Sequence, residues 1–352
     1  MKKRFRTATT VGAFVLATAF GIQPLTSYAS VTLNVFTDPH PTVGGGTIGF
    51  TYAGNKFVGS VQADGNNVLY STDLNGGNVQ VFAPTVFIPG GSPSSEHFVS
   101  SSLGLGGFPN RDVYVAAGNS IIHIDNAGTT SNTFVSGLAS AVRGITFDTV
   151  GTFGNDMLVT TIGGQIYRVD SLGSPTLLAS VGEDTEGLDV APLGAGFGGK
   201  DGQLIVASEG SGNIRAISNT GVATTLITGI PGGPEELTFV PLNLGASGNP
   251  VEGFYGSNYT QNVLKADASQ FTGFLGDAIV TTEFSHQMLR LHWNGAAFDV
   301  TTIGTFPNQP EDGLFVTAAI INPTGTVPEP SALLLLGSGL AGLAYWRRRL
   351  VA

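Results

Sequence analysis

Short, almost unbroken apolar runs recur along the chain, separated by polar and glycine-rich links. They span residues 68–70, 113–115, 157–159, 204–206 and 278–280. Asn, Asp, Gln and Gly bound most of them, and runs of this length between turn residues are typical of strands buried on both faces. A second pattern follows each run closely: a polar residue, apolar residues around a cation, and then a turn. Its copies lie at residues 120–125, 165–170, 213–218, 262–267 and 287–292, with a weaker first copy at 78–82.

Two further patterns complete a repeating unit. An opening strand is predicted at residues 143–147, 186–190, 236–240 and 312–316, and a closing strand at 133–135, 175–178, 223–227 and 298–300. Copies of the cation-centred pattern are spaced by 42, 45, 48, 49 and then 25 residues. Four short strands in about 45 residues is the arithmetic of a β-propeller blade.

The sequence therefore predicts an all-β protein with a β-propeller over residues 30–321. A β-sandwich is the alternative, but it would show hydrophobic alternation without a fixed period. Six blades are expected, and seven stay possible if residues 47–61 contribute separately. The 25-residue interval is too short for a blade, so one unit must be truncated or rearranged around residues 245–274. We expect the last opening strand, at Asp312, to complete the first blade and close the ring.

The N-terminus has the pattern of a secretory signal peptide spanning residues 1–29. Four basic residues precede an apolar stretch at 11–22, and Ser27-Tyr28-Ala29 forms a small-x-small cleavage site. Cleavage after Ala29 would make Ser30 the first mature residue. An uncleaved anchor is the alternative.

The C-terminus combines a proline-flanked acid, a short apolar run and a basic end. Val327, Pro328, Glu329 and Pro330 precede an uncharged stretch at 331–346. Prolines on both sides of Glu329 disfavour helix and regular strand, so this segment is expected to be extended. Sixteen helical residues span roughly 24 Å, somewhat short of a comfortable membrane crossing. A basic stop follows, made of Arg347, Arg348 and Arg349.

These C-terminal residues resemble the PEP-CTERM sorting signal of exopolysaccharide-producing Gram-negative bacteria. The alternative is an ordinary C-terminal anchor, which would leave the Pro-Glu-Pro sequence unexplained. The resemblance implies export across the inner membrane, anchoring through a transmembrane helix at 331–346, and processing by an exosortase. It also implies sorting to the cell envelope or the extracellular matrix, with exopolysaccharide as a possible partner. In this division residues 322–327 are a linker and 328–352 the sorting signal.

Charge and cysteine content exclude several classes of function. Without its two ends, the chain has 8 Lys and Arg against 24 Asp and Glu, a net charge of −16. Nucleic acid is therefore not expected as a partner, because phosphate binding needs clustered basic residues. The chain contains no cysteine, which excludes disulfides, thiol catalysis and thiolate metal sites.

Candidate chemistry rests on acids that lead the opening strands. In a propeller these strands are innermost, so Glu186, Glu236, Glu311 and Glu96 would line one mouth of the channel, together with Arg143. Converging carboxylates suit Ca²⁺, which prefers six to eight oxygen ligands. The alternative is that these acids cap strand ends and face solvent.

The opening strands also resemble those of calcium-dependent propeller enzymes of the gluconolactonase and streptogramin-lyase type. Such enzymes place a metal-binding acid, an asparagine and a catalytic acid or histidine in the channel, and a full set does not map onto this sequence. His97 is the only histidine near an opening strand, whereas His123 and His292 are expected on the blades, away from the channel. No catalytic residue is assigned. The sequence favours a binding or structural module, with a calcium-dependent extracytoplasmic enzyme as the alternative.

Overall fold

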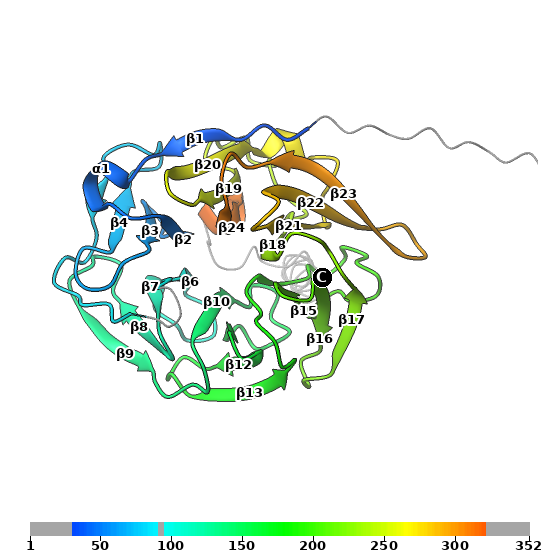
Figure 1. The fold of residues 1–352 in the computed structure, drawn as a ribbon, viewed down its shortest axis with the longest axis horizontal. Coiled ribbons are helices and arrows are strands. Elements are labelled where there is room, and N and C mark those ends of the chain that lie inside the picture. Colours follow the sequence, from blue (N-terminus) through cyan, green and yellow to red (C-terminus); the bar gives the residue numbers. More distant parts are fainter. Residues whose placement is uncertain (1–29, 91–94, 322–352) are drawn as a thin grey trace, which may run out of the picture.

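The chain forms a closed ring of six four-stranded antiparallel sheets, or blades, around a central channel (Figure 1). The computed structural model describes residues 30–90 and 95–321. The predicted all-β propeller is confirmed, and the blade count is six. Residues 47–61 form two strands of an ordinary blade and not part of a seventh.

Four blades follow the chain in order, and in each the first strand lies nearest the channel. Blade 1 contains β2 (Thr47–Tyr52), β3 (Phe57–Val61), β4 (Leu69–Thr72) and β5 (Gln80–Val81). Blade 2 contains β6 (Val99–Leu103), β7 (Asn110–Ala117), β8 (Ser120–Ile124) and β9 (Ser131–Val135). Blade 3 contains β10 (Val142–Phe147), β11 (Met157–Thr161), β12 (Gln165–Val169) and β13 (Pro175–Ser180). Blade 4 contains β14 (Leu188–Val190), β15 (Leu204–Ser208), β16 (Asn213–Ile217) and β17 (Ala223–Ile227).

The last two blades interleave along the chain. Blade 5 contains β18 (Pro234–Phe239), β21 (Ala278–Thr282), β22 (Gln287–Trp293) and β23 (Phe298–Thr305). Blade 6 contains β24 (Pro310–Val316), β19 (Gly253–Asn258), β20 (Asn262–Asp267) and β1 (Asn34–Thr37). After β18, the first strand of blade 5, the chain crosses to blade 6 and forms the hairpin of β19 and β20. It then returns to blade 5 and forms β21, β22 and β23.

This excursion explains the 25-residue interval in the sequence pattern, because the two copies that it separates, β20 and β22, belong to different blades. It also corrects one expectation. The last opening strand, β24, does not complete the blade that begins at Thr47; it completes blade 6, beside β19. The ring does close there as expected, because β1 from the start of the chain pairs with β20 in the same sheet.

The blades are held together by buried second strands and by aromatic contacts. Every residue of β11, β15 and β21 is buried, because each blade packs between two others. At the ring closure, Phe57 of blade 1 packs against Tyr255 of blade 6 with 4.7 Å between ring centroids, and it packs edge-on against Phe36 of blade 6 at 5.1 Å. Aromatic pairs of this kind contribute about 0.5–1.5 kcal/mol beyond the area that they bury.

Glycines in the turns between third and fourth strands also fit neighbouring blades. Gly173 and Gly221 adopt φ values of 79° and 85°. A Cβ atom at Gly173 would lie 2.2 Å from the carbonyl oxygen of Phe134 in the preceding blade. A Cβ atom at Gly221 would lie 2.1 Å from the carbonyl oxygen of Leu178 in its preceding blade. A side chain is therefore excluded twice, by backbone conformation and by space.

Helix is scarce in the described residues. It is limited to α1 (His40–Val43), the 3-10 turn η1 (Ala268–Phe271) and α2 (Ala318–Ile321). Within residues 30–90 and 95–321, no helix has the length and apolar character needed to cross a membrane. The predicted signal peptide and transmembrane helix lie outside the described residues.

Candidate functional site: an acidic mouth of the channel

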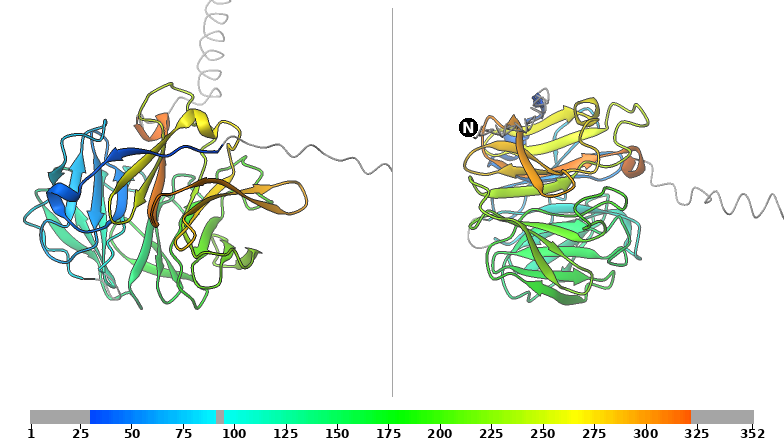
Figure 2. Two further views of the ribbon diagram at one scale, coloured as in Figure 1. Left: turned by 45° about the horizontal axis from the view of Figure 1, so that its top comes forward. Right: turned by 90° about the vertical axis from the view of Figure 1, so that its right-hand side faces the viewer.

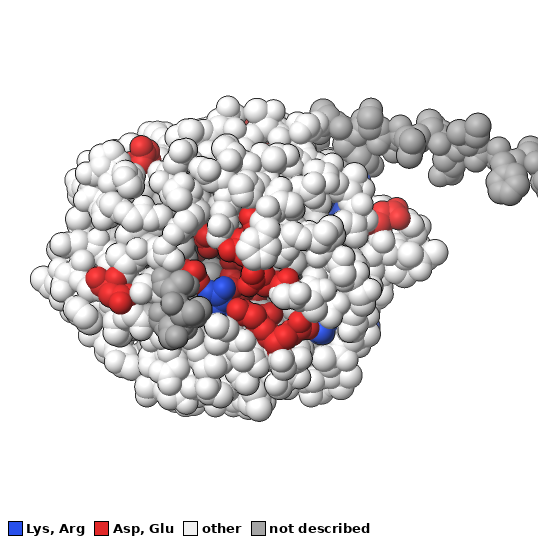
Figure 3. Space-filling view, viewed as in Figure 1, with Lys and Arg blue, Asp and Glu red and all other residues white. Residues whose placement is uncertain are grey.

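Strand direction brings many carboxylates to one end of the channel. The six innermost strands begin at this end, and the second strands, which run antiparallel to them, finish there. Acids that precede or begin a first strand, or directly follow a second strand, therefore meet around the axis. We call this group the acidic mouth; its members are Glu96, Asp184, Glu186, Glu209, Glu235, Glu283 and Glu311. Figure 3 shows acidic side chains gathered over the central opening.

One guanidinium, that of Arg143 on β10, provides the positive charge within this group. It forms ion pairs with Glu96 and Glu186, and its Nε lies 3.5 Å from Asp184. A fourth carboxylate, that of Glu209, is 4.0 Å from Nη2. The Arg143 side chain is only 11% exposed, so its charge acts on these acids with little screening.

Three acids of the mouth have no basic partner. In the described structure no Lys, Arg or His nitrogen lies within 4 Å of the Glu235, Glu283 or Glu311 carboxylates. The Gln309 amide donates to Glu311 at 2.9 Å. The Oε2 atom of Glu235 is buried and has no hydrogen-bond partner. A buried, unpartnered carboxylate oxygen is costly unless a proton or a cation satisfies it.

Burial and the excess of acidic over basic side chains at the mouth raise the pKa values of these three acids. Burial raises the pKa of Glu235 well above its ordinary value, and Arg143 only partly offsets this. Burial, together with the charge of Glu235, likewise raises the pKa of Glu311. The pKa of Glu283 rises to about 8 through burial and through the neighbouring Glu209 carboxyl. The mouth therefore holds protons at a pH where isolated glutamates do not.

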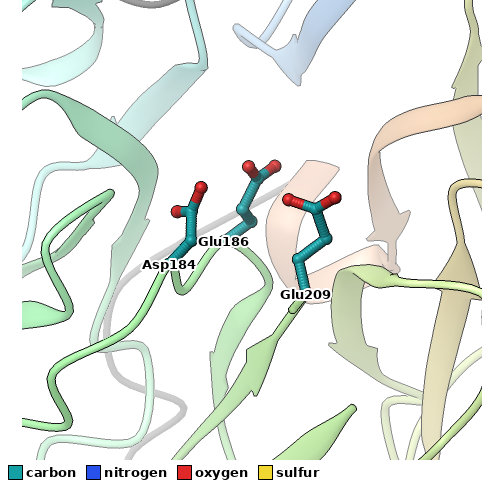
Figure 4. Close-up of side chains that lie close together, drawn as sticks. All are labelled: Asp184, Glu186 and Glu209. Carbon is teal, nitrogen blue, oxygen red and sulfur yellow. The ribbon is translucent and has the colours of Figure 1, made fainter. Parts of the chain in front are cut away.

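Two subsets of the mouth have the dimensions of a cation site. The carboxylates of Asp184, Glu186 and Glu209 place one oxygen each within 4.8 Å of the others, and Glu209, Glu235 and Glu283 do the same. Figure 4 shows the first three carboxylates reaching into the channel beside one another. A Ca²⁺ ion bound 2.3–2.6 Å from each oxygen needs oxygens at most about 5 Å apart. Glu209 belongs to both subsets, so the two positions adjoin.

The structure brings together most of the acids predicted from sequence. Glu96, Glu186 and Glu311 converge with Arg143 at the mouth. Glu236 does not join them. It follows Glu235 on β18, and successive side chains of a strand point to opposite sides. Its closest charged neighbours are instead Asp312 and Asp189, deeper in the channel.

Four members of the mouth were not predicted from the sequence: Asp184, Glu209, Glu235 and Glu283. For two of them a signal exists. Glu209 and Glu283 each directly follow a fully buried second strand, β15 or β21, and such strands end at the mouth. An acid directly after the last residue of a buried second strand is therefore predicted to lie at the mouth.

The histidines lie outside the site. His97 is fully buried, and its two ring nitrogens lie 2.8 Å from the carbonyl oxygens of Ala116 and Ala63. His123 and His292 lie on third strands, away from the channel, as predicted. Each is paired with an aspartate of its own blade, Asp112 or Asp277.

The opposite end of the channel has a different character. A cavity of about 920 Å³ opens there and extends along the channel as far as Arg143 and Glu186. It is lined mostly by apolar side chains of the innermost strands and of the loops that follow. Asp189 and Asp312 lie within it, but backbone amides of neighbouring first strands donate to them, at 2.8 Å from Phe239 and from Phe50. Burial raises the pKa of these carboxyls to about 6 and about 7. They link adjacent blades.

Comparison with known sequences identifies the C-terminal segment. Residues 326–349 match the PEP-CTERM protein-sorting motif. The resemblance noted in the sequence is thus confirmed, although Val327 to Pro330 and Arg347 to Arg349 lie outside the described residues. The motif implies processing by an exosortase, export, membrane anchoring and then sorting to the cell surface. No curated protein is detectably similar to the chain in sequence.

Solved structures with similar architecture are propellers of low sequence identity. A streptogramin B lyase is 15% identical, with a TM-score of 0.47 over 80% of this chain and 91% of that chain. A putative gluconolactonase is 11% identical, with a TM-score of 0.49 over 80% and 84%. The calcium-binding protein regucalcin from Agrobacterium tumefaciens is 13% identical, with a TM-score of 0.49 over 81% of each chain. At this distance, the comparisons leave the activity of the present chain unspecified.

Proposed function

We propose that this protein is an extracytoplasmic propeller that binds a divalent cation, with Ca²⁺ as the favoured ion, in its acidic mouth. It would act as a binding or structural module at the cell envelope or in the extracellular matrix. The sorting motif supports the location. The observation that carries the cation site is the buried, unpartnered oxygen of Glu235 beside Glu209 and Glu283.

Charge and ligand type favour Ca²⁺ over transition metals. The acids that define the mouth offer carboxylate oxygens, and hard oxygen ligands suit Ca²⁺ and Mg²⁺. The excess of carboxylates over the single Arg143 would be partly neutralised by one divalent ion. An ion at the solvent-facing end of the channel would keep coordination positions open for hydroxyl or carboxylate oxygens of an exopolysaccharide.

Thermal unfolding with and without Ca²⁺ tests this proposal. A ligand that binds only the folded state at a hundredfold excess over Kd stabilises it by about 2.7 kcal/mol. We expect a higher melting temperature in millimolar Ca²⁺, reversal by a chelator, and loss of the shift in Glu209→Gln, since Glu209 belongs to both subsets. Asp267→Asn is the matched control, because it removes one exposed charge on blade 6 outside the mouth. A melting temperature indifferent to Ca²⁺ and chelator in the wild type would reject the site.

The sorting role is tested separately. In an exosortase-bearing host, Glu329→Ala should leave unprocessed full-length protein in the membrane, whereas the wild type is processed. Mature protein from the same host should begin at Ser30. Identical processing of wild type and variant would reject the sorting role of Glu329 and would leave an ordinary C-terminal anchor as the interpretation.

A second candidate function is a cation-dependent enzyme acting outside the cytoplasm. The observation in its favour is Glu283, whose raised pKa of about 8 suits a general acid or base beside a bound metal ion. In this case Ca²⁺ would be held by Asp184, Glu186 and Glu209, leaving Glu283 free to act as the acid or base. Ca²⁺-dependent opening of a sugar lactone, lost in Glu283→Gln while Ca²⁺ still raises the melting temperature, would support the enzyme. Absence of turnover across a panel of lactones, with Ca²⁺ bound, would favour the binding module.

A further inference from the structure

The end of the channel opposite the acidic mouth has an exposed apolar rim. Leu105, Leu193 and Leu242 follow the first strands of three different blades, and their side chains are 43%, 58% and 44% exposed. All three line the same cavity, together with Ile320 of α2. We call the rim that these four residues form at this end of the cavity the apolar mouth. Exposed apolar side chains that gather around one opening are typical of a surface that contacts a protein, a membrane or a ligand.

The described chain also ends at the apolar mouth. The backbone amide of Ala318 donates to the buried Glu252 carboxylate at 2.8 Å, and the buried Arg111 guanidinium donates to the Ile320 carbonyl. These two contacts hold α2 at the rim of the cavity. Figure 2 shows α2 at the margin of one face of the ring. Whatever follows Ile321 therefore leaves the body from this side.

The length of the remaining chain limits how far the body can lie from a membrane. Ten residues, 322–331, lie between Ile321 and Ala332, where the apolar stretch within the sorting motif begins. Fully extended, the eleven Cα–Cα steps from Ile321 to Ala332 reach at most about 40 Å. While the C-terminal stretch sits in a bilayer, the apolar mouth is thus the part of the body tethered closest to the lipid. The acidic mouth lies at the other end of the channel.

We propose that the apolar mouth docks on the non-cytoplasmic surface of the membrane that holds the protein's own C-terminal segment. Leu105, Leu193 and Leu242 would enter the interface between lipid headgroups and acyl chains, where apolar side chains gain by leaving water. The acidic mouth would then face away from the lipid and stay open to its cation. This inference rests on the membrane anchoring that is part of the proposed function.

Site-specific fluorescence in vesicles tests the orientation. The chain has no cysteine, so Asn243→Cys at the apolar mouth and Ser285→Cys beside the acidic mouth each give a single labelling site. The full mature chain is reconstituted in phosphatidylcholine vesicles that contain lipids with a shallow nitroxide quencher. We expect at least twofold stronger quenching of the label at 243 than of the label at 285.

The outcomes separate docking from anchoring. Equally weak quenching at both positions, in protein that floats with the vesicles, overturns docking and leaves anchoring intact. Protein that does not float with the vesicles overturns both. A label at 243 that is shielded from the lipid nitroxide and also from aqueous iodide would show that the chain's own apolar segment at 332–346 covers the mouth, which also overturns lipid docking.

A rim variant tests the leucines themselves. In the Asn243→Cys background, combined replacement of Leu105, Leu193 and Leu242 by Gln should reduce lipid quenching to the level of the label at 285. The Ca²⁺-induced rise in melting temperature serves as the control for an intact fold and acidic mouth. Unchanged quenching in the folded variant would overturn the role of the rim.

Discussion

On three blades an acidic side chain is paired with a basic residue of the same blade, whereas most acidic side chains of the mouth have no basic partner of their own. On blade 5, Asp277 precedes the second strand and meets Arg290 of the third strand at 2.6 Å and His292 at 2.8 Å. Blades 2 and 3 contain similar pairs between second and third strands, Asp112–His123 and Asp156–Arg168. Each aspartate there has its own basic residue as a partner, whereas the seven acids of the mouth surround the single Arg143. A chain with so few basic residues thus pairs charge within these blades and leaves most carboxylates of the channel without a basic partner of their own. This contrast supports the cation site proposed at the mouth, where such carboxylates are most numerous.

Removing the one cation of the mouth should have the largest effect. Arg143→Gln leaves Glu96 and Glu186 without their partner, and breaking a buried ion pair in this way costs about 3–5 kcal/mol. We expect a loss of this size in chemical unfolding at pH 8 with chelator present. Millimolar Ca²⁺ should restore a large part of it, because the ion replaces the missing charge. A loss that Ca²⁺ leaves unchanged would mean that Arg143 is needed for packing alone.

Breaking a blade pair should cost somewhat less and should not respond to Ca²⁺. Asp277→Asn leaves the buried Arg290 without its carboxylate, at a cost of about 3 kcal/mol. Unfolding of this variant with Ca²⁺ and with chelator should differ by the same amount as in the wild type. If Ca²⁺ rescued Asp277→Asn, the contrast between the two regions would fail.

The mouth should contribute to the pH dependence of stability, with the same sign as Asp189 and Asp312 deeper in the channel. Folding raises the pKa of Glu235, Glu283 and Glu311, so the folded state binds more protons than the unfolded state. This stabilisation is complete below the ordinary glutamate pKa of 4.5 and is lost as the pH rises through the folded value, about 8 for Glu283. Without divalent cations, the melting temperature should therefore fall between about pH 4.5 and pH 8. Saturating Ca²⁺ should flatten this slope, and a melting temperature that rises across the same window would contradict the assignment.

Glu235→Gln should have the smallest effect on the free energy of unfolding. This variant is diagnostic because it should stabilise the protein, whereas most substitutions of buried residues destabilise it. Glu235→Gln replaces a buried carboxyl, which without a cation must either keep a proton or carry an unpaired charge, by a neutral amide. At pH 8 with chelator it should therefore stabilise the protein by about 1 kcal/mol. The same variant should bind Ca²⁺ more weakly. Differential scanning calorimetry with chelator and with Ca²⁺ measures both. Destabilisation under both conditions would place Glu235 among the structural acids, with Asp277.

Much of the fold could be predicted from sequence because each strand carries a local signal. Buried second strands contain a short apolar run, and the turns between third and fourth strands contain glycine, so period and blade number follow. The excursion of β19 and β20 could not be read in this way, because a strand in blade 6 has the same pattern as one in blade 5. Within the site, Glu186 could be predicted from its position ahead of an opening strand. Glu235 and Glu236 are adjacent acids, and only the orientation of β18 decides which one faces the mouth.

The way in which the ring closes has a consequence for how this protein must mature. Strand β1 emerges first from the export machinery, yet its partner Lys265 lies 231 residues after Asn34, and the innermost strand of the same sheet, β24, comes last. Contacts at such separation form slowly, because a long loop must be closed before they stabilise anything. The final sheet therefore cannot be completed until nearly the whole body has crossed the membrane. If export begins at the N-terminus, the propeller would therefore close only when translocation has come within about ten residues of the sorting motif at 326–349.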